Sequence, residues 1–99
     1  MEIKIQTIHF EAGEKLQEHI QKRVSKFEKF SNEIRKVEVS LKVVKPETAM
    51  NKEASLRISV PGSELYAEKV ADTFEEAVDS CAETLTRQLA KYKEKHQTR

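Results

Sequence analysis

The side chains of this chain that could do chemistry are mainly lysines and arginines at helical spacing. Five basic or titratable residues recur at steps of four and three residues near the start: Lys15, His19, Lys22, Lys26 and Lys29. Three more recur at steps of four near the end: Arg87, Lys91 and Lys95. Because an α-helix has about 3.6 residues per turn, each set lies along one side of a helix. Two such surfaces could bind phosphate groups.

The distribution of charge also has a simpler interpretation. Residues 64–86 contain seven acids against Lys69, whereas residues 87–99 contain five bases against Glu94. Acids near a helix start and bases near its end are what the helix dipole favours, and charged faces are usually only solvated. Arg23 falls beside the apolar stripe of the first helix and would have to extend along the surface to join the lysines. From the charges alone, solvation is favoured and phosphate binding is the alternative.

Catalytic or metal chemistry finds little support in the sequence. Cys81 falls on the apolar side of the last helix, where a core thiol is the expected role because no base is indicated beside it. Gly13 and Gly62 do not form a phosphate-binding loop. The three histidines lack the spacing of metal ligands: His9, His19 and His96. We therefore expect neither an enzyme nor a bound metal or organic cofactor.

Length and composition limit the class of protein. The chain has 99 residues, the size of one domain. Its 18 lysines and arginines against 17 acids give a net charge of +1, so only segregated cations could attract nucleic acid. No stretch reads as a signal peptide or a membrane span, and a lone cysteine fits a reducing compartment. We expect a single cytoplasmic domain over residues 1–99 that makes no membrane contact.

Hydrophobic periodicity predicts the elements that position these side chains. The alternation of Ile3 and Ile5 with polar residues predicts a strand that continues to about Ile8 or Phe10. Apolar residues at steps of three and four predict a helix over about 12–30. A last helix begins after Asp72 or Thr73, since Glu75 and Glu76 follow in capping-box spacing. The aromatic residues on these two stripes are expected in the core rather than in contact with bases: Phe27, Phe30 and Phe74.

Three further strands lie between the two helices. They are predicted by alternation over about 34–43, 54–60 and 64–70, with a polar loop at 45–52 and a turn at 61–63. The order βαβββα predicts an α+β fold, with the last three strands antiparallel and both helices on one face of a four-stranded sheet. Tyr66 turns away from the core, as an exposed contact or, more commonly, an ordinary strand tyrosine. The opposite sheet face is expected in water: Lys4, Gln6, Glu38, Ser40, Lys42 and Arg57.

Both helices resemble those of a known family. The run from Glu14 to Phe30, the segment from Asp72 to Asp79 and the segment Arg87-Gln88-Leu89-Ala90-Lys91 occur here in the same strand pattern. Together they resemble the ribosome hibernation promoting factors, also called ribosome-associated inhibitors, over essentially the whole chain. The resemblance implies a fold similar to a double-stranded RNA-binding domain. It also implies binding to the small ribosomal subunit in the channel for messenger and transfer RNA, which inhibits translation under stress or in stationary phase.

The resemblance further implies which cations contact ribosomal RNA. Five residues match the family's contacts, and Lys22 and Lys95 are added from their helical positions. Thr84 stands where members often carry lysine, so one contact is absent or made by its hydroxyl. Without the second, dimerising domain of long members, the chain is expected to be of the short type and monomeric when free. The complete expected rRNA-binding set is Lys22, Arg23, Lys26, Lys29, Arg87, Lys91 and Lys95.

The expected function is inhibition of translation by occupancy, without catalysis or a small-molecule substrate. Its partners are the rRNA phosphates and proteins of the small subunit, where segregated cations can bind without reading a sequence. The alternative is a protein-interaction module in which the acidic stretch over residues 64–83 docks a basic partner and RNA plays no part. Salt-sensitive sedimentation with small subunits distinguishes these two hypotheses.

Overall fold

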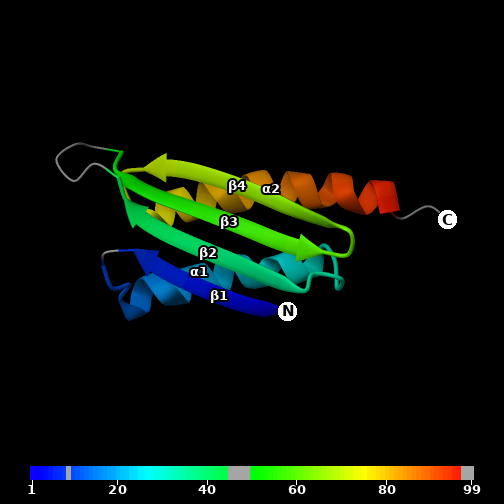
Figure 1. The fold of residues 1–99 in the computed structure, drawn as a ribbon, viewed down its shortest axis with the longest axis horizontal. Helices are drawn as coiled ribbons and strands as arrows, with labels where there is room; N and C mark the ends of the chain where they lie inside the picture. Colours follow the sequence, from blue (N-terminus) through cyan, green and yellow to red (C-terminus); the bar gives the residue numbers. More distant parts are fainter. Residues whose placement is uncertain (9, 45–49, 97–99) are drawn as a thin grey trace.

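The computed structural model describes residues 1–8, 10–44 and 50–96, the last two of these as backbone only. Within these ranges the elements follow in the predicted order, with a short 3-10 helix after the first helix (Figure 1). They are β1 Glu2–Ile8, α1 Glu14–Ser25, η1 Lys26–Lys29, β2 Lys36–Val43, β3 Lys52–Val60, β4 Ser63–Ala71 and α2 Phe74–His96.

The four strands form one sheet in the order β1-β2-β3-β4. β1 is parallel to β2, while β2, β3 and β4 pair antiparallel. Both helices cover the same face of this sheet and run in the same direction (Figure 1). α2 packs on β3 and β4, and α1 packs on β1 and α2. The predicted α+β fold is thus confirmed.

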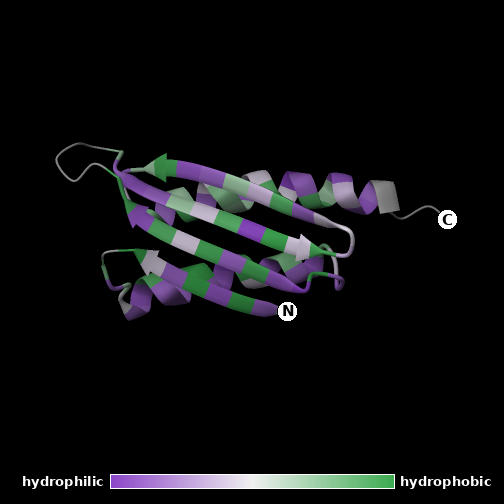
Figure 2. Ribbon diagram, in the orientation of Figure 1, coloured by the Kyte–Doolittle hydropathy of each residue, from purple (hydrophilic) through white to green (hydrophobic). Residues whose placement is uncertain are grey.

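Strand alternation separates a dry face from a wet face of the sheet. Leu41, Leu56 and Ile58 are fully buried beneath the helices, and hydropathy alternates along the strands (Figure 2). On the opposite face Lys4 and Arg57 are exposed. The polar face predicted from the sequence is therefore the one that lies outside the core.

The start of α2 has a side-chain cap. The backbone N–H of Glu76 donates a hydrogen bond of 3.1 Å to Thr73 Oγ1, so Thr73 is the capping residue of the two predicted. Asp72 instead accepts a 2.7 Å hydrogen bond from the backbone N–H of Met50. Beside the cap, the ring of Phe10 stacks on Phe74 with centroids 4.7 Å apart.

The first helix differs from the prediction at its end. It was expected to run to about residue 30, but α1 ends at Ser25 and continues as the 3-10 helix η1. Phe30 directly follows η1, and its backbone N–H donates a 3.0 Å hydrogen bond to the Phe27 carbonyl, the three-residue step of a 3-10 turn. Phe27 is fully buried, whereas Phe30 is only partly buried and packs at the margin of the core.

Strand boundaries differ from the prediction by one or two residues. Ile34 is buried but precedes β2, which begins at Lys36, and Phe10 lies beyond the end of β1. Lys52, predicted in the loop, already pairs with Ala71 as the first residue of β3. Residues 45–49 of that predicted loop lie outside the described residues.

The predicted turn at 61–63 joins β3 to β4 as a tight hairpin. Val60 pairs with Ser63, so Pro61 and Gly62 alone form the loop. Gly62 has a φ of 77°, a conformation that strains any residue with a side chain.

Candidate nucleic-acid interface

The three predicted lysines of the first helix are available to a ligand. Lys22 on α1 and both Lys26 and Lys29 on η1 are exposed. Among the described residues, none of the three takes part in an ion pair. Their charges are therefore not neutralised by the described part of the chain.

Arg23 is placed differently from these lysines. Its Nε lies 3.0 Å from Asp79 Oδ1 of α2, and its terminal nitrogen donates a 3.4 Å hydrogen bond to the Asp79 carbonyl. His19 Nε2 lies 2.8 Å from the same Oδ1. Arg23 and His19 are both partly buried. Instead of extending to join the lysines, Arg23 ties α1 to α2.

The predicted cations of α2 lie apart from those of α1. Arg87 and Lys91 are exposed, and the side chain of Lys95 lies outside the described residues. Gln88 donates a 3.2 Å hydrogen bond to the Tyr66 carbonyl of β4, which marks the side of α2 that faces the sheet edge. Lys91, one turn after Gln88, lies toward that same side.

The side of α2 that faces α1 carries a cation that the sequence prediction omitted. Asp79, Thr86 and Lys93 are spaced seven residues apart, which places them on one side of a helix. Because Asp79 contacts α1, Lys93 faces the same way, and a two-residue step turns Lys91 by about 200° away from it. The spacing of Asp79, Thr86 and Lys93 in steps of seven could have indicated that Lys93 lies on this side. That inference also requires knowing which side of α2 faces α1.

The parallel direction of the helices collects the cations at one end of the helix layer. Near the ends of the two helices lie five exposed cations that form no ion pair among the described residues, called here the basic end: Lys22, Lys26, Lys29, Arg87 and Lys91. Lys93 adds a sixth. Near the helix starts lie the acids Glu14, Glu18, Glu75 and Glu76. A chain of almost zero net charge thus acquires a strongly polar distribution.

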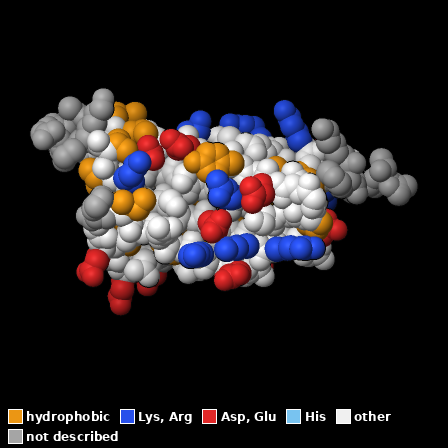
Figure 3. All heavy atoms as spheres, in the orientation of Figure 1, with side chains coloured by type: hydrophobic (Ala, Val, Ile, Leu, Met, Phe, Trp, Pro, Cys, Tyr) orange, Lys and Arg blue, Asp and Glu red, His pale blue; other side chains and the backbone are white. Residues whose placement is uncertain are grey.

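The open sheet face has a different electrostatic character. Lysines, arginines and acids are interspersed over it (Figure 3). Lys36 pairs with Glu38 at 3.4 Å, Lys42 pairs with Glu53 at 3.8 Å and Arg57 pairs with Glu64 at 3.8 Å. Three cations of this face are thus matched by neighbouring acids, whereas Lys4 forms no ion pair among the described residues.

Tyr66 lies on this sheet face and is 45% exposed. Its hydroxyl donates a 2.8 Å hydrogen bond to Glu68, which raises the Tyr66 pKa above its ordinary value, and Arg57 lies 5.3 Å from its ring centroid. Tyr66 is therefore an exposed residue held by its neighbours on the strand.

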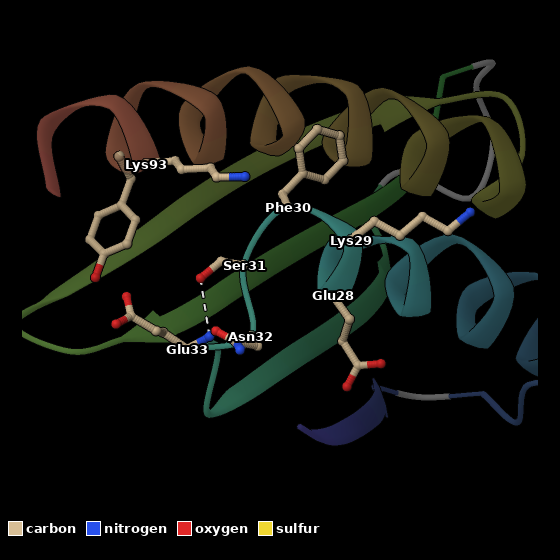
Figure 4. A pocket seen from close by; sticks show the side chains of 8 residues that line it. Glu28, Lys29, Phe30, Ser31, Asn32, Glu33 and Lys93 are labelled. Carbon is tan, nitrogen blue, oxygen red and sulfur yellow. Dashed lines mark hydrogen bonds between the residues drawn. The ribbon is translucent and has the colours of Figure 1, made fainter. Parts of the chain in front are cut away.

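A groove of about 390 Å³ opens at the basic end, between η1, the following loop and α2 (Figure 4). Phe30 lies between the two cations of this groove, since Lys93 extends toward Phe30 from α2 and Lys29 extends away on the other side. The complete lining is Glu28, Lys29, Phe30, Ser31, Asn32, Glu33, Tyr92 and Lys93.

Cys81 occupies the predicted core position. The residue is fully buried, and its single S–H can donate to the carbonyl of Ala54, 3.3 Å from Sγ, or to that of Ala67, 3.7 Å from Sγ. Burial raises the pKa of the Cys81 thiol to about 11. Its proton is therefore held at neutral pH, and the thiol has the properties of a small core side chain.

The described part of the chain offers no metal site. Within residues 1–8, 10–44 and 50–96, no three His, Cys, Asp or Glu side chains gather in a group that could hold a metal ion. No helix in the same ranges is long and apolar enough to cross a membrane. His19 takes part instead in the contact with Asp79, whereas His9 lies outside these ranges.

Comparison with known proteins identifies the family. The family described as Sigma 54 modulation protein / S30EA ribosomal protein matches residues 3–97, and this chain belongs to it. A Pseudomonas putida protein named ribosome hibernation promoting factor is 29% identical over 98 residues, covering 99% of this chain and 92% of the relative. The resemblance drawn from the two helices is confirmed.

Solved structures share the same fold. A ribosomal subunit interface protein from Coxiella burnetii superimposes with a TM-score of 0.80 at 22% identity, covering 94% of this chain and 98% of that one. The N-terminal domain of Thermus thermophilus Protein Y gives a TM-score of 0.79 at 17% identity, with coverage of 93% and 99%. At these identities the likeness concerns the fold.

Proposed function

We propose that this chain binds the small ribosomal subunit through the basic end of its helix layer and inhibits translation by occupying the channel for messenger and transfer RNA. It acts in the cytoplasm, as a monomer when free, under stress or in stationary phase. Family membership and the name of the Pseudomonas putida relative support a role at the ribosome. No catalytic step is part of this proposal.

One observation supports the helix layer, rather than the open sheet face, as the binding surface. The cations at the ends of both helices form no ion pairs among the described residues, whereas three cations of the open sheet face do. Unpaired lysines and arginines release counterions when they meet phosphates, and A-form RNA is recognised largely by its shape and phosphates. The helix layer is therefore the side of the molecule suited to rRNA.

The predicted rRNA-binding residues do not contribute equally to this surface. Lys22, Lys26 and Lys29 are free to reach phosphates, and Arg87 and Lys91 extend the surface across α2. Arg23 is held by Asp79, so its main role is to fix the two helices that carry the other cations. Lys95 remains a prediction.

The alternative, an acidic module over residues 64–83, is less well supported. Its acids do not share a surface, because Glu64 and Glu68 lie with Tyr66 on the open sheet face while Glu75, Glu76 and Glu83 lie on α2. Glu64 is also paired with Arg57, and Asp79 with Arg23. A basic partner that used the whole stretch, and not only the acidic start of α2, would have to contact both faces of the sheet.

Sedimentation of the purified protein with isolated small subunits at several salt concentrations tests the proposal. We expect saturation near one copy per subunit and an affinity that falls as salt rises. Messenger RNA with initiator transfer RNA should displace the protein. Absence of binding at low salt would remove the proposed function, and insensitivity to both RNAs would place the site outside the channel.

A further inference from the structure

The groove at the basic end combines features that separate phosphate contacts do not require. It places the partly buried aromatic ring of Phe30 between Lys29 and Lys93 (Figure 4). Neither lysine forms an ion pair among the described residues. We infer that this groove receives one unstacked nucleotide of RNA, with its base on Phe30 and its flanking phosphates at Lys29 and Lys93. The inference rests on the proposed function and specifies the contact at one point of that surface.

The aromatic ring is suited to a base rather than to the core alone. Phe27, one turn earlier, is completely buried, so the core beneath η1 is already filled by that ring. Phe30 packs on the core and also lines the groove. Stacking on an aromatic ring is a common means of holding single-stranded bases, because every base has a π-face. A volume of about 390 Å³ lies within the usual range of ligand pockets.

The polar lining divides the groove into a phosphate side and a base-edge side. Asn32 and Glu33 lie on the loop across from Lys93 (Figure 4). The Ser31 hydroxyl accepts a 3.1 Å hydrogen bond from the Glu33 backbone N–H, which fixes this loop. A carboxylate accepts hydrogen bonds from exocyclic amino groups and repels phosphate. The groove should therefore prefer adenine, cytosine or guanine, which carry an exocyclic amino group, to uracil, which carries none.

Glu28, the other acid of the lining, is already engaged. Its carboxylate lies 3.8 Å from the N-terminal ammonium of Met1, which partly neutralises it. The remaining acid, Glu33, is thus the one assigned to the base edge.

The test compares two aromatic substitutions. Phe30→Leu keeps an apolar side chain on the core but removes the stacking ring, and Phe10→Leu makes the same change beside Phe74, near the start of α2. Each variant is titrated with single-stranded A5 and U5 RNA and with isolated small subunits, and its thermal unfolding is recorded. We expect Phe30→Leu to weaken A5 and subunit binding about tenfold without changing the salt slope, since no cation is lost. Phe10→Leu should bind as the unmodified protein does.

A charge substitution gives the complementary signature. Lys93→Gln should flatten the plot of log affinity against log salt by somewhat under about one unit for both ligands. Glu33→Gln should reduce the preference for A5 over U5. Each of the three substitutions removes a different part of the proposed contact. Together they separate stacking on Phe30, the phosphate contact of Lys93 and recognition of the base edge by Glu33.

Other outcomes would overturn either the inference or the proposed function. If Phe30→Leu leaves binding unchanged while Lys93→Gln flattens the slope, the groove holds phosphate alone. If Phe30→Leu weakens subunit binding but not A5 binding, the ring meets a ribosomal protein. If the unmodified protein binds A5 through Phe30 but does not bind the subunit, the proposed function fails while the nucleotide site stands.

Discussion

At the scale of single residues, the contact between Asp79 and the first helix distinguishes a cation that joins the helices from the cations proposed to bind RNA. The Asp79 Oδ1 atom lies 3.0 Å from Arg23 Nε and 2.8 Å from His19 Nε2. Lys22 and Lys26, which neighbour Arg23 in the sequence, have no acidic partner among the described residues. Arginine and lysine in one helical run therefore have different surroundings: Arg23 joins the two helices, whereas the lysines are exposed.

The substitution Asp79→Asn should lower the free energy of unfolding by roughly 1 kcal/mol at low salt. This single change weakens both contacts of Asp79 with the first helix, those to His19 and Arg23. Glu83→Gln is the matched control, since Glu83 is exposed on the same helix and forms no ion pair among the described residues. Urea unfolding measures both. An equal loss in the two variants would mean that Asp79 is only one more surface acid.

Cys81 gives a prediction for the pH dependence of stability. Burial raises its pKa from 9.0 to about 11 in the folded chain, so the unfolded chain loses this proton first as pH rises. Stability due to this group is complete below pH 9 and is lost between about pH 9 and 11, by up to about 3 kcal/mol.

The variant Cys81→Ala isolates this contribution. It removes the thiol while leaving all lysines and tyrosines to titrate as before. Urea unfolding at several pH values should show that the free energy of unfolding of the unmodified protein falls more steeply over this window. Parallel curves for the two proteins would show that the thiol does not titrate on unfolding.

At the scale of elements, the cap of α2 positions the helix that carries Arg87, Lys91 and Lys93. Thr73→Ala removes the oxygen that accepts the Glu76 N–H, and the melting temperature should fall by about 4–8 °C for a loss of about 1 kcal/mol. Thr84→Ala is a threonine control in the middle of α2, where alanine favours the helix. Thermal unfolding followed by circular dichroism compares them. A similar decrease of the melting temperature in both variants would argue against a stabilising role of the Thr73 cap.

Most elements could be predicted because their periodicity reflects local geometry. Alternation marked all four strands, and the apolar stripe marked α2 from Phe74 onward. The predicted end of the first helix was wrong because a step of three residues fits both an α-helix and a 3-10 turn. The spacing of Phe27 and Phe30 therefore could not distinguish these two kinds of helix.

The candidate site was only partly predictable, for a physical reason. A helical wheel gives the relative directions of side chains on one helix, but it does not say which direction faces another helix. The pairing of Arg23 with Asp79 and the shared groove of Lys29 and Lys93 depend on that rotation. Exposure of Lys22, Lys26 and Arg87 could be predicted because it follows from distance to the apolar stripe.

At the scale of the whole molecule, the fold separates a sheet face on which three cations are paired from an end of the helix layer whose exposed cations form no ion pair among the described residues. Lysine, arginine and glutamate alternate across the strands of the sheet, so that neighbours pair, as Lys42 of β2 does with Glu53 of β3. The crossover from β1 through α1 makes the two helices parallel, which brings their basic ends together. Segregation of charge here follows from topology, with a net charge of only +1.

The central claim is that the helix layer, rather than positive charge in general, binds the small subunit. Two triple variants with equal loss of charge test it most directly. One replaces Lys22, Lys26 and Lys29 with glutamine on α1 and η1, and the other replaces Lys4, Lys36 and Lys42 with glutamine on β1 and β2. The measurement is the affinity for isolated small subunits as a function of salt concentration. We expect the helix triple to flatten the plot of log affinity against log salt by about two to three units, and the sheet triple to leave it unchanged. Equal flattening by both triples would contradict the assignment of the binding surface to the helices.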